Sequence, residues 1–324
     1  PVVVHIVWNT AAENISDAQI FSQMDVLNAD FRRTNSDAIN TPSVWQSVAT
    51  DSEIDFCLAT TDPNGVATTG ITRTQTSQTS FSINGSDMKS SSSGGIDPWD
   101  QDDYLNIWVC DLSGGILGYA TPPSNFNNPE DGVVIGYKYF GTIGTVQSPY
   151  NKGRTATHEV GHWLGLRHVW GDALCGDDNV KDTPAAREPN FGINLSDFPY
   201  HVGFMSQGCV ADSLNPAGEM FVNYMDYSSD AHVTMFTKGQ NEVMNETLEG
   251  IYDEDAGTSG IGFREYMWSA ENIALSGVAD GFITPICNQN TDFVSSSGKY
   301  SMCLGENIVL KGNKTQFPSG TVSS

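Results

Sequence analysis

Basic residues are scarce in this chain of 324 residues, where 15 lysines and arginines stand against 39 aspartates and glutamates. The formal net charge of −24 makes nucleic acid and anionic membrane surfaces poor partners. No apolar run reaches the length of about 18 residues that a membrane-spanning helix needs, so none is expected. The first residues, PVVVHIVW, lack the basic region and the cleavage site of a signal peptide, and we interpret them as a strand.

Cysteine is limited to six residues, and none of them has the spacing of a zinc-finger site. Cys175 and Cys209 flank a long polar stretch, and we expect a disulfide between them that restrains it. The pairing of the other four stays open; they are Cys57, Cys110, Cys287 and Cys303. Abundant Ser, Thr, Asn and Gly, little Lys and an even cysteine count are typical of a secreted, extracellular protein.

Histidine is rare as well, yet three of the six histidines crowd into the stretch HEVGHWLGLRH. On an α-helix His158 and His162 share one face, roughly 6 Å apart along the axis. A continued helix would carry His168 roughly 240° away from that face. Gly165 favours a left-handed end of the helix, after which the chain can return. Three neutral imidazoles would then bind one Zn²⁺ and leave its fourth position open for water.

Glu159 directly follows the first of these histidines and lies beside the ligand face. From there its carboxylate can take a proton from a zinc-bound water and pass it on, so we assign it as the general base. The alternative interpretation is three unrelated histidines on an amphipathic helix. The metal site is favoured, because the pattern H-E-x-x-H-x-x-G-x-x-H arises by chance in only roughly 10⁻⁵ of such chains.

Hydrophobic periodicity predicts strands and helices in alternation before this motif. Strands are expected at residues 2–8, 54–65, 71–76, 104–112 and 131–142, and helices at 16–35, 155–164 and 234–250. Ser16 or Asp17 is the expected cap of the first helix, and Thr237 that of the last. Residues 114–123 are interpreted as a glycine-punctuated loop and 171–230 as irregular. The order indicates a mixed α+β fold, with a twisted, mostly parallel sheet and the zinc helix beneath it.

The segment NYMDY at 223–227 adds a second motif downstream of the histidines. Alone, Met225 would be interpreted as an ordinary core residue. Downstream of the zinc motif it fits a methionine turn, a hydrophobic floor beneath the imidazoles that is not itself a ligand. The Tyr227 hydroxyl could stabilise the oxyanion of a tetrahedral intermediate. Together the two motifs resemble those of the metzincin metallopeptidases, which implies a zincin domain with an irregular C-terminal subdomain below the cleft.

More specifically, the chain resembles the pappalysin family of metzincins, particularly its secreted bacterial members, over about residues 2–278. The segments that carry the resemblance include TTGITRTQT, LNIWVCDL, LGYATPP, HEVGHWLGLRH, CGDDNVKDTP, NYMDYSSDA and MFTKGQ. The resemblance implies a secreted zinc endopeptidase made as a zymogen. Its subdomains would be residues 1–165 above the cleft and 166–278 below it. An extended protein or peptide substrate would pair with an edge strand at 133–140.

The resemblance also implies bound calcium near the loop after the zinc helix. This loop offers hard oxygen ligands of the kind that Ca²⁺ prefers, at Asp177, Asp178, Asp182 and Thr183. From composition alone the loop would be interpreted as acidic and solvated. The resemblance is what turns the interpretation toward a structural calcium site.

Some family members cleave before arginine and use an acidic residue just beyond the methionine turn. Asp230 is the candidate here, which implies a preference for Arg or Lys at P1′, the position after the scissile bond. A surface aspartate is the competing interpretation. Relatives often anchor a second disulfide in this stretch, whereas this chain has DAHVTMF without cysteine. That departure puts the shape of the pocket wall in doubt.

From about residue 286 to 324 the pattern changes to short strands and turns. It resembles the start of a PKD-like or immunoglobulin-like β-sandwich that the chain end truncates. Two other functions compete with the peptidase: a non-catalytic adhesion or binding protein on a metzincin shell, and a zinc hydrolase of small esters or amides. The intact Glu159 argues against the first, and the methionine turn and edge strand argue against the second.

Overall fold

The computed structural model describes residues 1–123, 128, 130–201, 209, 217–249, 252–253, 258–259, 264–279, 291–295 and 298–302. The chain divides into two compact units, Pro1–Phe282 and Ile283–Ser324. In the second unit β8 (Thr291–Ser295) and β9 (Gly298–Met302) form an antiparallel hairpin. The rest of the sandwich predicted over 286–324, with Cys287 and Cys303, lies outside the described residues, so that module stays a prediction.

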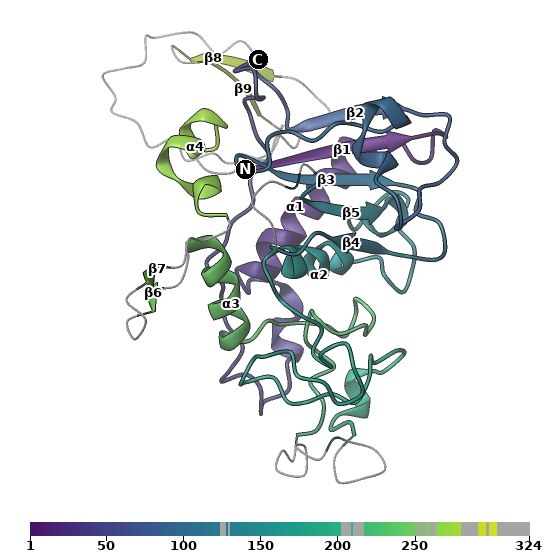
Figure 1. Cartoon of the computed structure of the whole chain (residues 1–324), viewed down its shortest axis with the longest axis vertical. Coiled ribbons are helices and arrows are strands. Elements are labelled where there is room, and N and C mark those ends of the chain that lie inside the picture. Colours follow the sequence, from purple (N-terminus) through teal and green to yellow (C-terminus); the bar gives the residue numbers. More distant parts are fainter. Residues whose placement is uncertain are drawn as a thin grey trace. The chain divides into compact units, whose positions relative to one another are not determined.

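A five-stranded sheet organises the first unit, in the order β2-β1-β3-β5-β4 (Figure 1). Its strands are β1 (Val2–Trp8), β2 (Ile71–Gln75), β3 (Leu105–Cys110), β4 (Gly118–Ala120) and β5 (Val133–Gly136). All neighbours pair in parallel except β4, which runs antiparallel to β5. The fully buried runs of β3 and β5 fit a parallel sheet that is covered on both faces. The predicted mixed α+β fold with a mostly parallel sheet is confirmed.

The edge of the sheet differs from the prediction. β5 lies between β3 and β4, so the edge strand is β4 and not the segment at 133–140. β4 forms inside the stretch 114–123 that was interpreted as a loop. Its three residues are too few to show a periodicity of their own, and pairing with β5 creates the strand. Conversely, the strand expected at 54–65 is reduced to two isolated bridges, from Leu58 to Val2 and from Thr61 to Ala67.

Two helices cover the same face of the sheet. α1 (Asp17–Phe31) begins after Ser16, whose hydroxyl accepts a hydrogen bond from the Gln19 amide, and α2 (Arg154–Trp163) packs on β4 and β5. The apolar side chains of both helices and of β1, β3 and β5 form one core. The opposite face of the sheet is covered by the segment from 76 to 104, which contributes Phe81 and Met88 to a second core.

Below α2 in Figure 1 lies the irregular region, which has a small core of its own around Trp45 and Phe221. A disulfide joins Cys175 and Cys209. The sequence left the pairing of Cys57 and Cys110 open, and neither forms a disulfide within the described part of the chain.

Short elements complete the fold. α3 (Lys238–Glu249) begins after Thr237, whose hydroxyl accepts a hydrogen bond from the Gln240 amide, as predicted for that cap. β6 (Tyr252–Asp253) pairs with β7 (Thr258–Ser259), and α4 (Ala270–Leu275) is the last helix among the described residues. Short 3₁₀ turns lie at Ser36–Asn40, Asp87–Lys89, Ser91–Ser93, Tyr137–Tyr139, Leu195–Asp197 and Tyr266–Trp268. Within the described ranges no helix has the length and apolar character to cross a membrane.

Candidate active site

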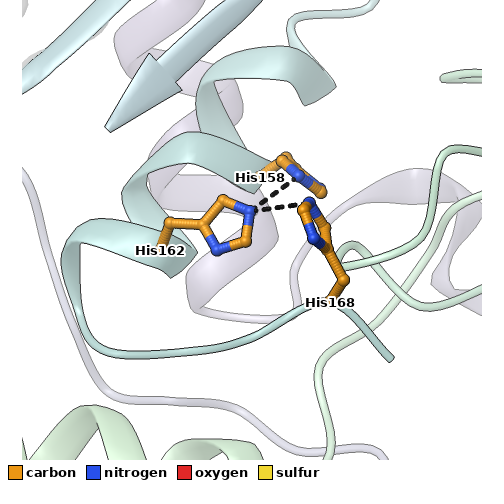
Figure 2. Close-up of side chains that lie close together, drawn as sticks. All are labelled: His158, His162 and His168. Atoms are coloured by element: carbon orange, nitrogen blue, oxygen red, sulfur yellow. Dashed lines mark hydrogen bonds between the residues drawn. The ribbon is translucent and has the colours of Figure 1, made fainter. Parts of the chain in front are cut away.

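Helix α2 and the turn that follows it bring three histidines together (Figure 2). His158 and His162 lie on one face of α2, which ends at Trp163. Gly165 then adopts a φ of +95°, the left-handed conformation that glycine tolerates best, and the chain returns His168 to the other two. The Nε2 atom of His162 lies 3.1 Å from that of His158 and 3.0 Å from that of His168.

Hydrogen bonds at Nδ1 fix the tautomer of all three rings. The partners of these Nδ1 atoms are the Tyr224 carbonyl for His158 (2.7 Å), the Leu166 carbonyl for His162 (2.8 Å) and the Asp172 carboxylate for His168 (2.5 Å). Carbonyl and carboxylate oxygens only accept, so each neutral ring carries its proton on Nδ1. The three Nε2 atoms therefore turn unprotonated lone pairs toward one another.

This arrangement of lone pairs fits a zinc ion. Three lone pairs at such short separations repel one another unless a cation lies between them. Nitrogen ligands about 2.0–2.1 Å from a tetrahedral zinc ion are about 3.3 Å apart, close to the separations seen here. Each ligand ring is also held by an outer hydrogen bond, as is usual for zinc-binding histidines. His158, His162 and His168 are thus the residues that would hold the metal.

Burial favours the neutral form of these imidazoles, which is the form that binds metals. Loss of hydration, with a smaller contribution from the neighbouring His168, lowers the pKa of His162 to about 4. The same loss of hydration lowers the pKa values of His158 and His168.

Glu159 lies in the wall of the same cavity as the three histidines. Its side chain packs against the edge strand, because a Cβ at Gly118 would lie 3.0 Å from the Glu159 Cγ. Burial raises the pKa of this carboxyl to about 8. A nearby divalent cation acts in the opposite direction and favours the carboxylate. The carboxylate in this position can therefore accept a proton beside the metal site.

Met225 is fully buried and contacts α2 at Gly161, between His158 and His162. A Cβ added at Gly161 would lie 2.5 Å from the Met225 Sδ, closer than two such atoms can approach. A side chain at Gly161, between His158 and His162, would therefore force the buried Met225 side chain to move.

Replacing Gly161 by Ala is expected to destabilise the protein by about 1–3 kcal/mol, although Ala has the higher helix propensity. Zinc release should also accelerate, since the clash lies next to His162. Denaturant unfolding and metal release to a chelator measure both effects. In a double variant with Met225→Ala the two costs should not add, because the smaller side chain relieves the clash. Additive costs would contradict this account.

Tyr227 stands at the rim of the site, with 36% of its surface exposed. Its ring centroid lies 4.9 Å from that of His168 and 5.6 Å from that of His158. Burial, with a contribution from the Glu159 carboxylate, raises the pKa of its hydroxyl to about 12. The phenol is therefore protonated at neutral pH and available as a hydrogen-bond donor.

Asp230 lies at the other end of the same cavity, near the start of α2. Its Oδ2 accepts hydrogen bonds from the backbone amides of Lys152 (2.7 Å) and Arg154 (3.2 Å). Burial raises the pKa of this carboxyl to about 6, against the effect of those two bonds. Asp230 is therefore a buried helix-capping carboxylate that also forms part of the cavity wall, rather than a surface aspartate.

Several residues of this cavity were not singled out from the sequence. Arg154 forms buried ion pairs with Asp30 (2.8 Å) and Asp37 (2.9 Å), and it also lines the cavity. The Tyr224 hydroxyl donates to Asp30 as well. These partners come from segments far apart in the sequence, so no local pattern indicates them. Only Asp172 could have been found from the sequence, because this carboxylate lies four residues after His168 in the chain.

The C-terminal end of α2 is held by a segment about a hundred residues later in the chain. The Arg264 guanidinium pairs with the Asp131 carboxylate, lies 3.8 Å from the Trp163 ring and donates to the Trp163 carbonyl. The Thr247 hydroxyl donates to the carbonyl of Leu164. Both contacts satisfy helix-terminal carbonyls just before the chain turns toward His168.

The residues predicted to bind calcium make local hydrogen bonds. The Thr183 hydroxyl donates to Asp178, and Asp177 accepts from the Asn179 amide. Asp182 accepts from the Thr237 hydroxyl and the Gly239 amide at the start of α3. Asp178 is buried, which raises the pKa of its carboxyl to about 6, and no lysine or arginine in the described ranges pairs with it. A buried carboxylate without a cationic partner is compatible with a bound cation.

The cavity lined by the three histidines, Glu159, Tyr227 and Asp230 has a volume of 820 Å³ and runs along β4. Gly118 lies beside Glu159 near the middle of α2, and Pro123 lies near Gly165 beyond its end. Asp230 marks the opposite end, at the start of α2. An extended chain laid along β4 would therefore pass the histidines and reach Asp230.

Comparison with known proteins identifies solved structures with a similar fold and a matching protein family. Residues 89–249 match the family described as Pregnancy-associated plasma protein-A, Peptidase_M43. Mature mirolysin of Tannerella forsythia in complex with a cleaved peptide is 48% identical with a TM-score of 0.74, over 85% of this chain and 97% of that one. Promirolysin of the same organism is also 48% identical, with a TM-score of 0.72 over 82% of each chain.

Curated relatives match over a shorter region. Extracellular metalloprotease 1 of Coccidioides posadasii is 35% identical over 148 residues, which are 44% of this chain and 48% of the relative. The chain therefore spans about half the length of the curated relatives it matches. Fold and sequence together define a metzincin zinc metallopeptidase domain. Within that class, the chain belongs to the pappalysin family.

Proposed function

We propose that this protein is a secreted zinc endopeptidase that hydrolyses peptide bonds in proteins, with Glu159 as the general base. The observation that carries the proposal is the convergence of three unprotonated Nε2 atoms beside a buried carboxylate, in a cavity that runs along a free sheet edge. The solved relative with a cleaved peptide and the relatives named extracellular metalloproteases support a peptide substrate and an extracellular site of action.

The chain's own residues divide the chemistry among them. Zinc, when bound by the three histidines, supplies Lewis-acid polarisation of a carbonyl and lowers the pKa of water. Glu159 takes a proton from the attacking water and delivers it to the leaving amine. The Tyr227 hydroxyl donates a hydrogen bond to the oxyanion that forms on the scissile carbonyl. Met225 keeps the floor of the site apolar and in place.

The edge strand β4 binds the substrate in this proposal. Among the described strands β4 pairs only with β5, so its outward amides and carbonyls can pair with an extended peptide. Residues 1–165 and 166–278 would form the two sides of the cleft. The peptide would run antiparallel to β4 and bring its scissile bond beside Glu159.

Asp230 is proposed to select Arg or Lys at P1′. The Asp230→Asn variant is expected to lose about tenfold in its preference for basic over neutral P1′ residues, the scale of one charge-assisted hydrogen bond. The amide oxygen of asparagine can still accept from the Lys152 and Arg154 amides, so α2 should be retained. Because the carboxyl has a pKa of about 6, the wild-type preference should fade as the pH falls through 6, where the negative charge is lost. Peptide pairs that differ only at P1′ measure both effects, and an unchanged preference would remove Asp230 from this role.

Calcium near Asp178, Asp182 and their neighbours, and synthesis as a zymogen, are also proposed. The calcium proposal is supported by Asp178, a buried carboxylate that pairs with no lysine or arginine in the described ranges. The zymogen proposal is supported by the promirolysin form of the solved relative. Added calcium should raise the thermal midpoint of the wild type but not that of an Asp178→Asn variant. An equal response of both proteins would move the calcium elsewhere.

The function itself is tested by incubating the zinc-loaded protein with a mixed peptide library and sequencing the cut sites, with and without a zinc chelator. Cuts that the chelator abolishes support the peptidase. If small esters were cleaved and peptides were not, the proposal would give way to a small-substrate hydrolase. Intact peptides and esters after incubation with zinc-loaded, correctly folded protein would favour a non-catalytic binding protein.

A further inference from the structure

A second hollow, of 340 Å³, lies on the other side of the edge strand from the zinc helix. Lys89, Thr121 and Glu130 belong to its wall. Tyr119 and Pro122 line both this hollow and the active-site cavity. The two spaces are therefore neighbours across β4, and the smaller one has no part in the mechanism above.

β4 directs its side chains alternately to the two spaces. Gly118 faces α2, since a Cβ there would meet Glu159. Tyr119 faces the opposite side, where its hydroxyl contacts the Met88 Sδ at 3.2 Å and its ring packs in the second core. A peptide paired antiparallel to β4 presents its own side chains with the same alternation. Every second residue of such a peptide would point toward the hollow.

Lys89 gives the hollow its chemical character. It is 5% exposed, and no other lysine in the described ranges is buried. Its ammonium donates to the Glu130 carbonyl at 2.5 Å and lies over the rings of Trp108 (4.9 Å) and Tyr119 (5.3 Å). An ammonium has three donors, and no carboxylate among the described residues lies within ion-pairing distance of it.

Burying an ammonium without a carboxylate partner is costly, so an incoming carboxylate would gain an unusually favourable contact there. Burial lowers the pKa of Lys89 to about 8, while Glu130 and Asp131 act to raise it. The amine is thus charged at neutral pH. In a chain with a net charge of −24, this hollow offers a local cationic contact to an acidic side chain.

The hollow lies toward the end of the cleft that would hold the amino-terminal side of the substrate. β4 runs in the same direction as α2, from Gly118 beside Glu159 to Pro123 near Gly165. The hollow is lined by Ala120, Thr121 and Pro122, and so lies toward the far end from Asp230. A peptide antiparallel to β4 places the residues before its scissile bond at that end.

We propose that this hollow is a second specificity subsite, in which the Lys89 ammonium binds the carboxylate of an Asp or Glu residue on the amino-terminal side of the scissile bond. The inference rests on the proposed peptidase function. The enzyme would then prefer substrates with an acidic residue before the scissile bond and a basic residue at P1′.

The test is a library of peptides randomised at the four positions before a fixed, cleavable bond, incubated with the zinc-loaded enzyme. Asp and Glu should be enriched about tenfold at one of these positions, the scale of a charge-assisted hydrogen bond. A pair of peptides that differ only by Glu or Gln at that position should differ by the same factor in kcat/KM. In the Lys89→Met variant the Glu-over-Gln ratio should fall to about one.

The Lys138→Met variant is the matched control, because Lys138 also lies over a tyrosine ring, that of Tyr137, at 5.1 Å. It should keep the wild-type ratio. The wild-type peptide pair tests the proposal even if Lys89→Met fails to fold. Cleavage without an acidic preference, or an unchanged ratio in a folded Lys89→Met variant, would overturn the subsite and leave the peptidase standing. If zinc-loaded wild type cleaved no peptide at all, both proposals would fall together.

Discussion

Replacing Glu159 by Ala is expected to lower kcat by about a thousandfold or more while the protein still folds and binds zinc. General-base catalysis by a positioned side chain contributes about 10²–10⁴-fold. Glu159 is a buried carboxylate on the helix that carries His158 and His162, and it lines the same cavity as the three histidines. The three proposed metal ligands are all histidine nitrogen atoms, so removal of this carboxylate would leave the proposed ligand set intact. Cleavage kinetics of a single peptide and metal content by elemental analysis give the two readouts.

Two further variants sharpen this experiment. Tyr227→Phe removes a hydrogen-bond donor to the oxyanion and should lower kcat by about 10–100-fold with little change in KM, less than the loss from Glu159→Ala. Glu246→Ala removes an exposed glutamate of α3 and should be silent. A Glu159→Ala enzyme that retained zinc and near-normal turnover would show that the base lies elsewhere.

Removing the metal is expected to abolish cleavage altogether and to lower the thermal midpoint. Without a cation, the three Nε2 lone pairs at 3.0 and 3.1 Å repel one another within a largely buried site. A ligand that binds only the folded state also stabilises it by mass action, and chelation reverses that contribution. Activity and melting should be measured before chelation, after it, and after the metal is restored.

Restoring metals one at a time separates the two proposed ions. Zinc alone should restore cleavage, whereas calcium alone should restore part of the thermal midpoint without cleavage. A His168→Ala variant should bind zinc far more weakly and resist rescue at low zinc concentration, because one of three ligands is missing. Cleavage that survived complete removal of zinc would contradict a metallopeptidase of any kind.

Local sequence determined the parts of this protein that depend on near neighbours in the chain. The spacing of His158, His162 and His168 around Gly165 predicted a convergent ligand set, because helical geometry and a left-handed glycine fix that path over eleven residues. The caps at Ser16 and Thr237 follow from the same short-range rules. The mixed α+β fold and the family could also be predicted from the sequence, because the apolar runs and the motifs are strong.

Tertiary structure alone decided which groups from distant segments meet at the site. β4 became the edge strand because three residues without a periodicity of their own found a partner in β5. Arg264 reached the end of α2, and the buried Lys89 came to lie beside the cleft, through contacts 101 and 41 residues apart in the chain. Such encounters depend on how whole layers pack, and no local propensity records them. The sequence thus specified the groups proposed to react, whereas packing specified the surfaces proposed to select a substrate.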